Sequence, residues 1–361
     1  MARALTLARP FAHRTSPNPS VGCVLTRPSG EILGEGHTQP AGGPHAEVVA
    51  LAEARARGHD VRGATAWVTL EPCAHVGRTG PCCDALVAAG IARVVAAIGD
   101  PNPRVGGRGF ERLRAAGITV EVGPGAAAAR ELNLGFFSRM VRGQPWVRMK
   151  MAASLDGTTA LPNGRSQWIT SEAARADGHA WRAHACAVLT GIGTVLEDDP
   201  RLDVRLFDTP RQPRLVVVDS RLELPPTARL FEPERPVLVY AAMNDAVRQA
   251  ALQARGATVV HLPGAGGKVD LAAMLRDLAQ REVNELHVEA GHKLNGSLVR
   301  EGLVDEFLVY LAPALLGEGA GMAAIGPFTD LAEGVPLQFR AVGTVGPDLR
   351  VLARIPGRDA F

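Results

Sequence analysis

The sequence predicts an α/β protein built from two domains in series. Its 361 residues suit two domains at the usual size of about 150 residues each. Strand-like and helix-like apolar patterns alternate along the chain, which is typical of α/β folds. The turn-forming run Gly143-Gln144-Pro145 interrupts this alternation and marks the expected boundary. We therefore expect one domain over residues 1–143 and another over residues 144–361.

In the first domain, the expected elements alternate from the N-terminus onward. Residues 2–9 have the amphipathic spacing of a helix, and the prolines of Pro17-Asn18-Pro19 indicate an extended loop. Apolar runs at 21–26 and 31–36 predict a β-hairpin around Pro28-Ser29-Gly30. The alternation indicates a three-layer α/β domain. The remaining signals are a helix from His45 to Arg57, a strand at 64–70, a helix at 81–89, a strand at 93–99, and further helix and strand patterns at 107–116, 118–122 and 126–141.

The segment from His45 to Cys83 contains the pattern of a catalytic zinc site. One imidazole, His45, and two thiolates, Cys73 and Cys82, supply three ligands and leave the fourth position open for water. Such a metal lowers the pKa of its water, and Glu47 is placed two residues from His45 to relay the proton. The zinc deaminases combine these groups as H-x-E…P-C-x-x-C. Here the two cysteines are further apart, as P-C-x8-C.

Two alternatives for this cluster stay open on the residues alone. The histidine and cysteines could be ordinary core residues. A structural zinc would need a fourth ligand, which Cys83 could supply, but Glu47 would then have no chemical task. If a helix begins with Pro81 at its first position, Cys82 lies in the first turn, where the helix dipole favours a thiolate. Cys83 would then point elsewhere and pack in the core.

The second domain carries two glycine-containing runs of low specificity. Gly291–Ser297 opens a helix after a strand, and such an N-terminus suits an anion, for example a pyrophosphate. Gly191-Ile192-Gly193-Thr194 is a second glycine loop, and both runs are also compatible with simple tight turns. Strands are expected at 146–153, 185–190, 214–219, 236–240, 257–261, 285–289 and 304–311, with helices in the gaps, for example at 171–184 and 271–280.

Several polar residues allow two interpretations, as ligand contacts or as ordinary surface and turn residues. Arg182, Arg201 and Arg205 could hold a substrate phosphate, or they could be solvated surface charges. Asn18 could point its amide at a ligand, or it could be a plain turn asparagine.

Composition excludes several classes of function. The formal net charge of +2 and the lack of a long basic run argue against a dedicated nucleic-acid binder. No apolar run approaches the ~20 residues of a membrane span, and the N-terminus lacks the apolar core of a signal peptide. Five cysteines with a metal-like cluster suit a reducing compartment better than a disulfide scaffold. We expect a cytoplasmic protein that binds neither membrane nor nucleic acid.

These motifs closely resemble those of the bacterial bifunctional riboflavin-biosynthesis deaminase–reductases, over nearly the whole chain. The resemblance is most specific at the wide cysteine spacing with Gly77-Arg78-Thr79 inside it, and at Ser166-Gln167-Trp168-Ile169-Thr170. The other matching motifs are Pro17-Asn18-Pro19, Val21-Gly22-Cys23, Pro44-His45-Ala46-Glu47, Leu70-Glu71-Pro72-Cys73, Pro81–Leu86, Asp100-Pro101-Asn102-Pro103, Ala153–Gly157, Asp198-Asp199-Pro200, Val288–Gly291 and Gly302–Glu306.

The resemblance implies a cytidine-deaminase-like domain followed by a dihydrofolate-reductase-like α/β domain. The first would use zinc to hydrolyse the 2-amino group of 2,5-diamino-6-(5-phosphoribosylamino)pyrimidin-4(3H)-one. The second would use NADPH to reduce the ribosyl group of the product to ribityl. The resemblance also implies self-association into a homo-oligomer.

Matching positions imply a role for each site residue. Zinc falls on His45, Cys73 and Cys82, and proton transfer falls on Glu47. Arg182 and Arg205 would clamp the 5′-phosphate of the substrate. The implied cofactor contacts are Ala152, Trp168, Thr194, Asp198, Ser220, Gly291, His292, Lys293, Leu294, Asn295, Gly296 and Ser297, and the implied substrate contacts are Asn18, Arg78, Ser166, Arg182, Leu202, Arg205 and Glu289.

The chain departs from the family pattern at a few positions. The family has a histidine at the place of Thr38, whereas here His37 comes one residue earlier, which affects an expected substrate contact. Val76 and Gly80 replace the usual residues of the zinc loop, but neither is a ligand. Three alternative functions are a deaminase with a degenerate reductase half, a base deaminase acting on RNA or nucleosides, and a zinc-stabilised binding module without catalysis.

Overall fold

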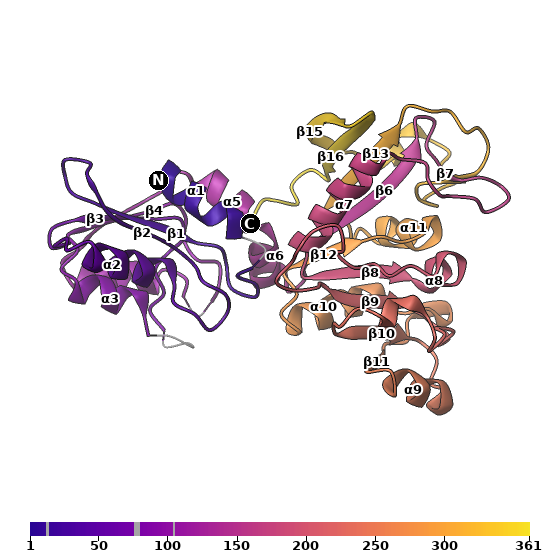
Figure 1. The fold of residues 1–361 in the computed structure, drawn as a ribbon, viewed down its shortest axis with the longest axis horizontal. Helices are drawn as coiled ribbons and strands as arrows, with labels where there is room; N and C mark the ends of the chain where they lie inside the picture. The colour runs from indigo at the N-terminus through magenta and orange to yellow at the C-terminus, as the bar shows by residue number, and fades with distance from the viewer. Residues whose placement is uncertain (12–13, 76–79, 104) are drawn as a thin grey trace. The chain divides into compact units, whose positions relative to one another are not determined.

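The computed structural model describes the chain except residues 12–13, 76–79 and 104. It divides into two compact units, Met1–Gly143 and Gln144–Phe361 (Figure 1). The sequence analysis places the boundary at the same glycine-proline turn. Among the described residues, no helix is both long enough and apolar enough to span a bilayer.

The described part of the first unit is built on a five-stranded sheet of order β2-β1-β3-β4-β5. Strands β2, β1 and β3 pair antiparallel, and β3, β4 and β5 pair parallel. The strands are β1 (Gly22–Thr26), β2 (Ile32–His37), β3 (Thr65–Val68), β4 (Arg93–Ala96) and β5 (Thr119–Val122). The helices are α1 (Ala2–Ala8), η1 (Arg9–Phe11), α2 (Ala46–Ala56), α3 (Cys82–Ala88), α4 (Arg108–Ala115), α5 (Ala126–Leu132) and α6 (Leu134–Arg142).

Glycines bring helices close to both faces of this sheet. A Cβ on Gly22 would lie 1.9 Å from the carbonyl oxygen of Ala4 in α1. A Cβ on Gly36 would lie 2.3 Å from the carbonyl oxygen of Ala46, at the start of α2. Cys23 pairs with Gly36, so Gly22 and Gly36 face opposite sides of the sheet. The predicted three-layer arrangement is therefore confirmed, with α1 above and α2 below the sheet in Figure 1.

The second unit, described throughout, contains a nine-stranded sheet of order β11-β10-β9-β8-β12-β6-β13-β16-β15. The first seven strands in this order are parallel, and β16 and β15 add an antiparallel edge. The short strands β7 (Thr158–Ala160) and β14 (Ala320–Gly321) pair separately. The large sheet contains β6 (Trp146–Ser154), β8 (Ala187–Gly191), β9 (Arg214–Val218), β10 (Val237–Ala241), β11 (Ala257–His261), β12 (Glu285–Val288), β13 (Glu306–Ala312), β15 (Gln338–Val345) and β16 (Asp348–Arg354).

Helices join the parallel strands, as parallel connections require. The five connecting α-helices place apolar residues in the buried clusters against the sheet. They are α7 (Glu172–His184), α8 (Ile192–Asp198), α9 (Ala246–Gln253), α10 (Leu271–Gln280) and α11 (His292–Arg300), with short 3-10 turns at η2 (Arg229–Phe231), η3 (Ala265–Gly267) and η4 (Leu331–Glu333).

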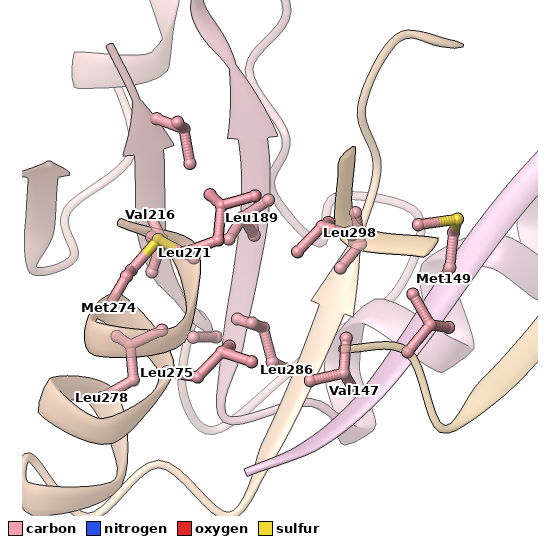
Figure 2. Packing of buried hydrophobic residues seen from close by; sticks show 14 of the residues in the cluster. Val147, Met149, Leu189, Val216, Leu271, Met274, Leu275, Leu278, Leu286 and Leu298 are labelled. Atoms are coloured by element: carbon pink, nitrogen blue, oxygen red, sulfur yellow. The ribbon is translucent and has the colours of Figure 1, made fainter. Parts of the chain in front are cut away.

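The two faces of the central strands differ in chemistry. One face is the main hydrophobic core, where Val147 and Leu286 pack with α10 residues such as Leu275 (Figure 2). The intervening residues of the same strands point to the opposite face, because successive strand residues alternate. On that face His287 of β12 stands opposite Arg148 of β6. A row of charged groups is thus buried beside an apolar core.

Several local expectations needed correction. The signal at 126–141 resolves into two helices, because Asn133 leaves the helical conformation and its side chain bonds the backbone of Ser20. Pro81 is the N-cap of α3 with ψ 130° and not its first helical residue, so the helix begins one residue later than predicted. The glycine loop predicted at 191–194 is wrong, since Ile192 already begins α8.

Candidate active sites

Three elements of the first unit deliver the predicted zinc ligands to one place. His45 is the N-cap of α2, with extended backbone (φ −76°, ψ 164°). Cys82 is the first residue of α3, directly after Pro81. Cys73 lies in the loop that follows β3, three residues after Leu70. Two helix starts and one loop therefore converge, as the sequence predicts.

The ligand atoms have the spacing that a tetrahedral zinc ion needs. His45 Nδ1 lies 3.2 Å from Cys82 Sγ and 3.6 Å from Cys73 Sγ. All three atoms lie within 4.8 Å of one another. Zn–N and Zn–S bonds of about 2.0–2.3 Å at tetrahedral angles separate ligand atoms by about 3.6 Å. The residues present thus fit zinc in both donor type and spacing.

The two thiol groups of the site have pKa values shifted in opposite directions. The side chain of Cys82 donates to Cys73, and the Cys82 backbone N–H also lies 3.4 Å from Cys73 Sγ. These hydrogen bonds lower the pKa of Cys73 to about 4. The same interaction raises the pKa of Cys82. Cys73 is therefore already a thiolate at neutral pH, the form that binds a metal.

Glu47 lies in the first turn of α2, and only 4% of its surface is exposed. Burial raises the pKa of Glu47, and the nearby Cys73 thiolate raises it further. A carboxyl group with a raised pKa can both accept and return a proton near neutral pH. This environment suits the proton-transfer role predicted for Glu47.

Cys83 points away from the predicted metal ligands. Its Sγ donates to the carbonyl oxygen of Pro72 at 3.2 Å and also lies 3.5 Å from that of Gly109. Among the described residues, the one cluster of three potential ligands contains His45, Cys73 and Cys82. Cys83 is not positioned as a fourth ligand, so the structural-zinc alternative loses its donor.

A residue that sequence reasoning missed, Glu71, ties the ligand loop to its surroundings. Its buried carboxylate accepts backbone N–H bonds from Gly107 at 3.0 Å and Gly109 at 2.9 Å. Longer bonds come from Asp100 and Phe110, at 3.2 and 3.3 Å. The carboxylate thereby caps the start of α4 and fixes the strand end that carries Cys73. The signal in the sequence that could have indicated this role is an acidic residue directly after the strand expected at 64–70.

The structure bears differently on the other predicted contacts of the first unit. Asn18 closes a turn through its backbone N–H to the Thr15 carbonyl at 2.9 Å, and its ligand role stays a prediction. Arg78 lies outside the described residues. The Thr38 hydroxyl is buried and accepts the Val21 N–H at 3.0 Å, so Thr38 supports β1 rather than facing a ligand.

In the second unit, two predicted substrate contacts are paired with each other. Arg182 of α7 donates from Nε to Glu289 Oε1 at 2.6 Å and from Nη2 to Oε2 at 2.9 Å. Its Nη1 also donates to the Asp203 carbonyl at 2.6 Å. Burial opposes the charge of Glu289, but Arg182 holds the pKa of Glu289 well below its ordinary value. Glu289 is therefore a carboxylate that accepts hydrogen bonds.

Asp203 connects the other predicted phosphate-binding residues to this pair. Its carboxylate accepts from Arg205 Nη1 at 2.7 Å and lies 3.1 Å from Arg201 Nε. Leu202, beside it, is buried with a left-handed φ of 52°. Arg182 and Arg205 thus both donate to Asp203, and their role in binding a phosphate stays a prediction.

Two groups of the predicted cofactor residues lie beside α8. In one group, Gln167 donates to Asp198 at 3.1 Å, which brings the loop containing Ser166 and Trp168 to the end of α8. Trp168 is 66% exposed, and the Arg175 guanidinium stacks 4.6 Å from its ring centre. An exposed aromatic ring at this edge is available to a ligand.

The second group surrounds the start of α11. Gly291 is the N-cap of α11, and a Cβ there would lie 3.6 Å from Thr194 Oγ1 in α8. The starts of α8 and α11 are therefore neighbours. Ala152 lies on β6 and Ser220 follows β9, so both stay predictions at the same edge of the sheet.

Part of the predicted α11 run is committed to packing instead. The Asn295 amide donates to the Met322 carbonyl at 3.0 Å and is buried. A Cβ on Gly296 would lie 2.2 Å from the Ala324 carbonyl oxygen. Leu294 packs against Gly191, and Ser297 donates to the Lys293 carbonyl. Asn295 and Gly296 are thus buried, whereas Gly291 and Lys293 are exposed, and the contacts of this run with a cofactor stay predictions.

Comparison with known proteins follows the division into two units. Residues 1–98 match the family model "Cytidine and deoxycytidylate deaminase zinc-binding region", and residues 145–351 match "RibD C-terminal domain". Riboflavin biosynthesis protein RibD of Escherichia coli (strain K12) is 45% identical over 362 residues, covering 97% of this chain and 96% of the relative. The protein of the same name from Haemophilus influenzae is 42% identical over 371 residues, with 97% and 95% covered.

Solved structures agree over the same length. The structure titled "Acinetobacter baumannii RibD, form 1" has a TM-score of 0.89 at 40% identity, covering 98% of this chain and 97% of that chain. A Thermotoga maritima structure has a TM-score of 0.86 at 32% identity, with the same coverage. Its title describes a diaminohydroxyphosphoribosylaminopyrimidine deaminase and 5-amino-6-(5-phosphoribosylamino)uracil reductase.

Proposed function

Because the chain belongs to the RibD family of riboflavin biosynthesis proteins, we propose that its two units catalyse consecutive steps on one pyrimidine ribotide. The chain is an enzyme with a deaminase domain and a reductase domain. We assign residues 1–143 to the deaminase and 144–361 to the reductase. The observation that carries the first assignment is the convergence of His45, Cys73 and Cys82 beside buried Glu47.

In the first step, water replaces the 2-amino group of 2,5-diamino-6-(5-phosphoribosylamino)pyrimidin-4(3H)-one, and ammonia leaves. His45, Cys73 and Cys82 would hold the zinc ion, which when bound supplies a water that ionises near neutral pH. Glu47 takes a proton from the attacking water and returns it to the departing amine. Burial raises the pKa of this carboxyl, which favours such a relay.

In the second step, hydride passes from NADPH to C1′ of 5-amino-6-(5-phosphoribosylamino)uracil, the C1′–O4′ bond opens, and O4′ gains a proton. Binding and alignment are the main tasks of the protein in such a transfer. The adjoining starts of α8 and α11 suit the phosphates of the coenzyme. Arg182 and Arg205 suit the 5′-phosphate of the substrate, and Glu289 suits a ribose hydroxyl.

Two separate assays test the two assignments. The zinc-loaded chain should release ammonia from the diaminopyrimidine ribotide when no coenzyme is present. It should also oxidise NADPH when given the deaminated ribotide, and it should use NADH poorly. Ammonia release without NADPH oxidation would favour the alternative of a degenerate reductase half. Neither signal would favour a binding module.

A further inference from the structure

His287 is a buried histidine of the second unit that no step above uses. It lies on β12, two residues before Glu289, so both side chains point to the same face of the sheet. Its ring is 0% exposed, and its Nε2 lies 3.5 Å from Glu289 Oε1. Neither ring nitrogen has a hydrogen-bond partner among the described residues. Burying an unsatisfied ring N–H costs free energy, so this placement calls for a role.

The surroundings of His287 are a cage of charged side chains. On β6, Arg148 stands opposite His287 in register, and Lys150 lies 4.0 Å from Glu289. Arg182 reaches the cage from α7. On the other side, β8 contributes the apolar Val188 in register. Glu289 faces Nε2 of the ring, whereas Glu285 on the same face of β12 and Glu306 on β13 both pair with Arg148.

The ring is neutral at physiological pH. Burial lowers the pKa of His287 to about 3, and the cations Arg148, Arg182 and Lys150 oppose its protonation further. A neutral imidazole has one N–H, and a carboxylate only accepts hydrogen bonds. With its proton on Nε2, the neutral ring can donate a hydrogen bond to Glu289 Oε1.

Arg182 donates to both oxygens of Glu289, and His287 Nε2 lies 3.5 Å from Oε1, longer than a well-formed hydrogen bond. A substrate phosphate competes with Glu289 for the Arg182 guanidinium, because both are anionic acceptors that fit it in a bidentate manner. When Arg182 donates to the phosphate, Glu289 loses donors and needs another to keep its place. His287, whose Nε2 lies 3.5 Å from Oε1, is placed to supply that donor.

We propose that His287 is a positioning residue of the reductase site, whose Nε2–H holds the Glu289 carboxylate in place while Arg182 binds the phosphate of the substrate. This inference rests on the reductase function proposed above. It predicts that His287 acts on substrate binding through Glu289 and does not act on coenzyme binding or on the deaminase unit.

The kinetic test compares two variants of the zinc-loaded full chain. His287→Leu removes the donor, and His287→Gln keeps a donor of similar reach. With the deaminated ribotide, His287→Leu should raise KM for the ribotide about tenfold, the effect of one hydrogen bond to a charged group. KM for NADPH and ammonia release should not change, and His287→Gln should stay within about threefold of the wild type. An unchanged KM in His287→Leu, or equal losses in both variants, overturns the inference.

A measurement on the wild-type chain covers the case in which His287→Leu does not fold. In protein labelled with ¹⁵N-histidine, the His287 signal is identified by its loss in His287→Gln. The inference requires an Nε2–H tautomer whose shift changes when ribose 5-phosphate is added. An Nδ1–H tautomer or an unmoved signal overturns it. If the wild type fails to oxidise NADPH, the proposed function fails, and this spectrum still decides the role of His287.

Discussion

The ring nitrogen Nδ1 of His45 lies 3.2 Å from the Sγ of Cys82, although the two residues are 37 positions apart in the chain. The contact exists because α2 and α3 both begin at the same edge of the first sheet. Each helix start offers a partial positive charge that stabilises thiolates and other anions. The metal site is therefore assembled by the ends of rigid elements, not by a flexible loop alone.

Cys82 and Cys83 should differ sharply in their effect on zinc content. Cys82→Ser removes a ligand and weakens zinc binding, so the purified variant should retain less than one zinc per chain. Cys83→Ser is the matched control, because the Cys83 thiol faces the carbonyls of Pro72 and Gly109. Zinc analysis by mass spectrometry checks both. Equal zinc loss in both variants would show that Cys83 is also a ligand.

Glu47→Gln should separate catalysis from metal binding. The amide keeps the shape of the side chain but cannot relay a proton, so ammonia release should fall by about 10²–10⁴-fold. Zinc content should stay at that of the wild type, since Glu47 is outside the ligand set. NADPH oxidation with the deaminated ribotide should be unaffected. An active Glu47→Gln enzyme would rule out this residue as the proton relay.

Arg182 should stabilise the second unit as well as bind substrate. Arg182→Met leaves the Glu289 carboxylate buried without its main partner, and such losses cost about 3–5 kcal/mol. The double variant Arg182→Met/Glu289→Met removes both charges and should recover much of that cost. Urea denaturation of the wild type, Arg182→Met, Glu289→Met and the double variant gives the coupling free energy. Additive costs would contradict the pairing.

The stability of the second unit should depend on pH through His287. Burial lowers the pKa of His287 to about 3, whereas in the unfolded chain it is about 6.5. Between these values the unfolded state binds more protons, so the free energy of unfolding falls as pH falls below 6.5. One histidine contributes at most about 1.4 kcal/mol per pH unit. His287→Leu should have a shallower dependence between pH 6 and 4, and an identical slope would refute the assignment.

Gly296→Ala should lower the stability of the second unit through a steric clash and not through a lost contact with the coenzyme. A Cβ there would meet the Ala324 carbonyl at 2.2 Å, so α11 or the Ala324 segment must move, at about 1–3 kcal/mol. Gly178→Ala in α7 is the control, since a Cβ added there meets no atom within 4 Å apart from its chain neighbours and the backbone of its own helix. The control should keep or gain up to about 1 kcal/mol through helix propensity. Thermal denaturation of both compares them.

The metal site could be predicted from sequence because its three ligands are of rare types and each stands at the start of an element or just after one. His45 and Cys82 precede apolar runs of helical spacing, and Cys73 follows a strand. Such local signals place residues on the same edge of a sheet without knowledge of the full fold. The orientation of Cys83 followed from its position next to Cys82.

The pairing of Arg182 with Glu289 could not be predicted in this way. The two residues are 107 positions apart, and no local pattern tells which strand lies under α7. The sequence analysis gave both residues to the substrate, and the structure shows that they also bind each other. Glu71 escaped notice for a similar reason, since its partners are backbone N–H groups that carry no side-chain signal.

The edge of the second sheet was missed for another reason. Strand β15 is exposed along nearly its whole length, so its residues lack the apolar alternation that identifies a half-buried strand. Its place in the sheet depends on pairing with β16, and register of that kind is set by the neighbouring strand.

The most direct test of the central claim is a coupled assay on the zinc-loaded full chain, given the diaminopyrimidine ribotide and NADPH together. We expect one ammonia released and one NADPH oxidised per ribotide consumed, with NADPH oxidation lagging behind ammonia release. In Glu47→Gln both signals should be lost, and adding the deaminated ribotide should restore NADPH oxidation alone. NADPH oxidation that persists in Glu47→Gln on the diamino compound would contradict the order of the two steps.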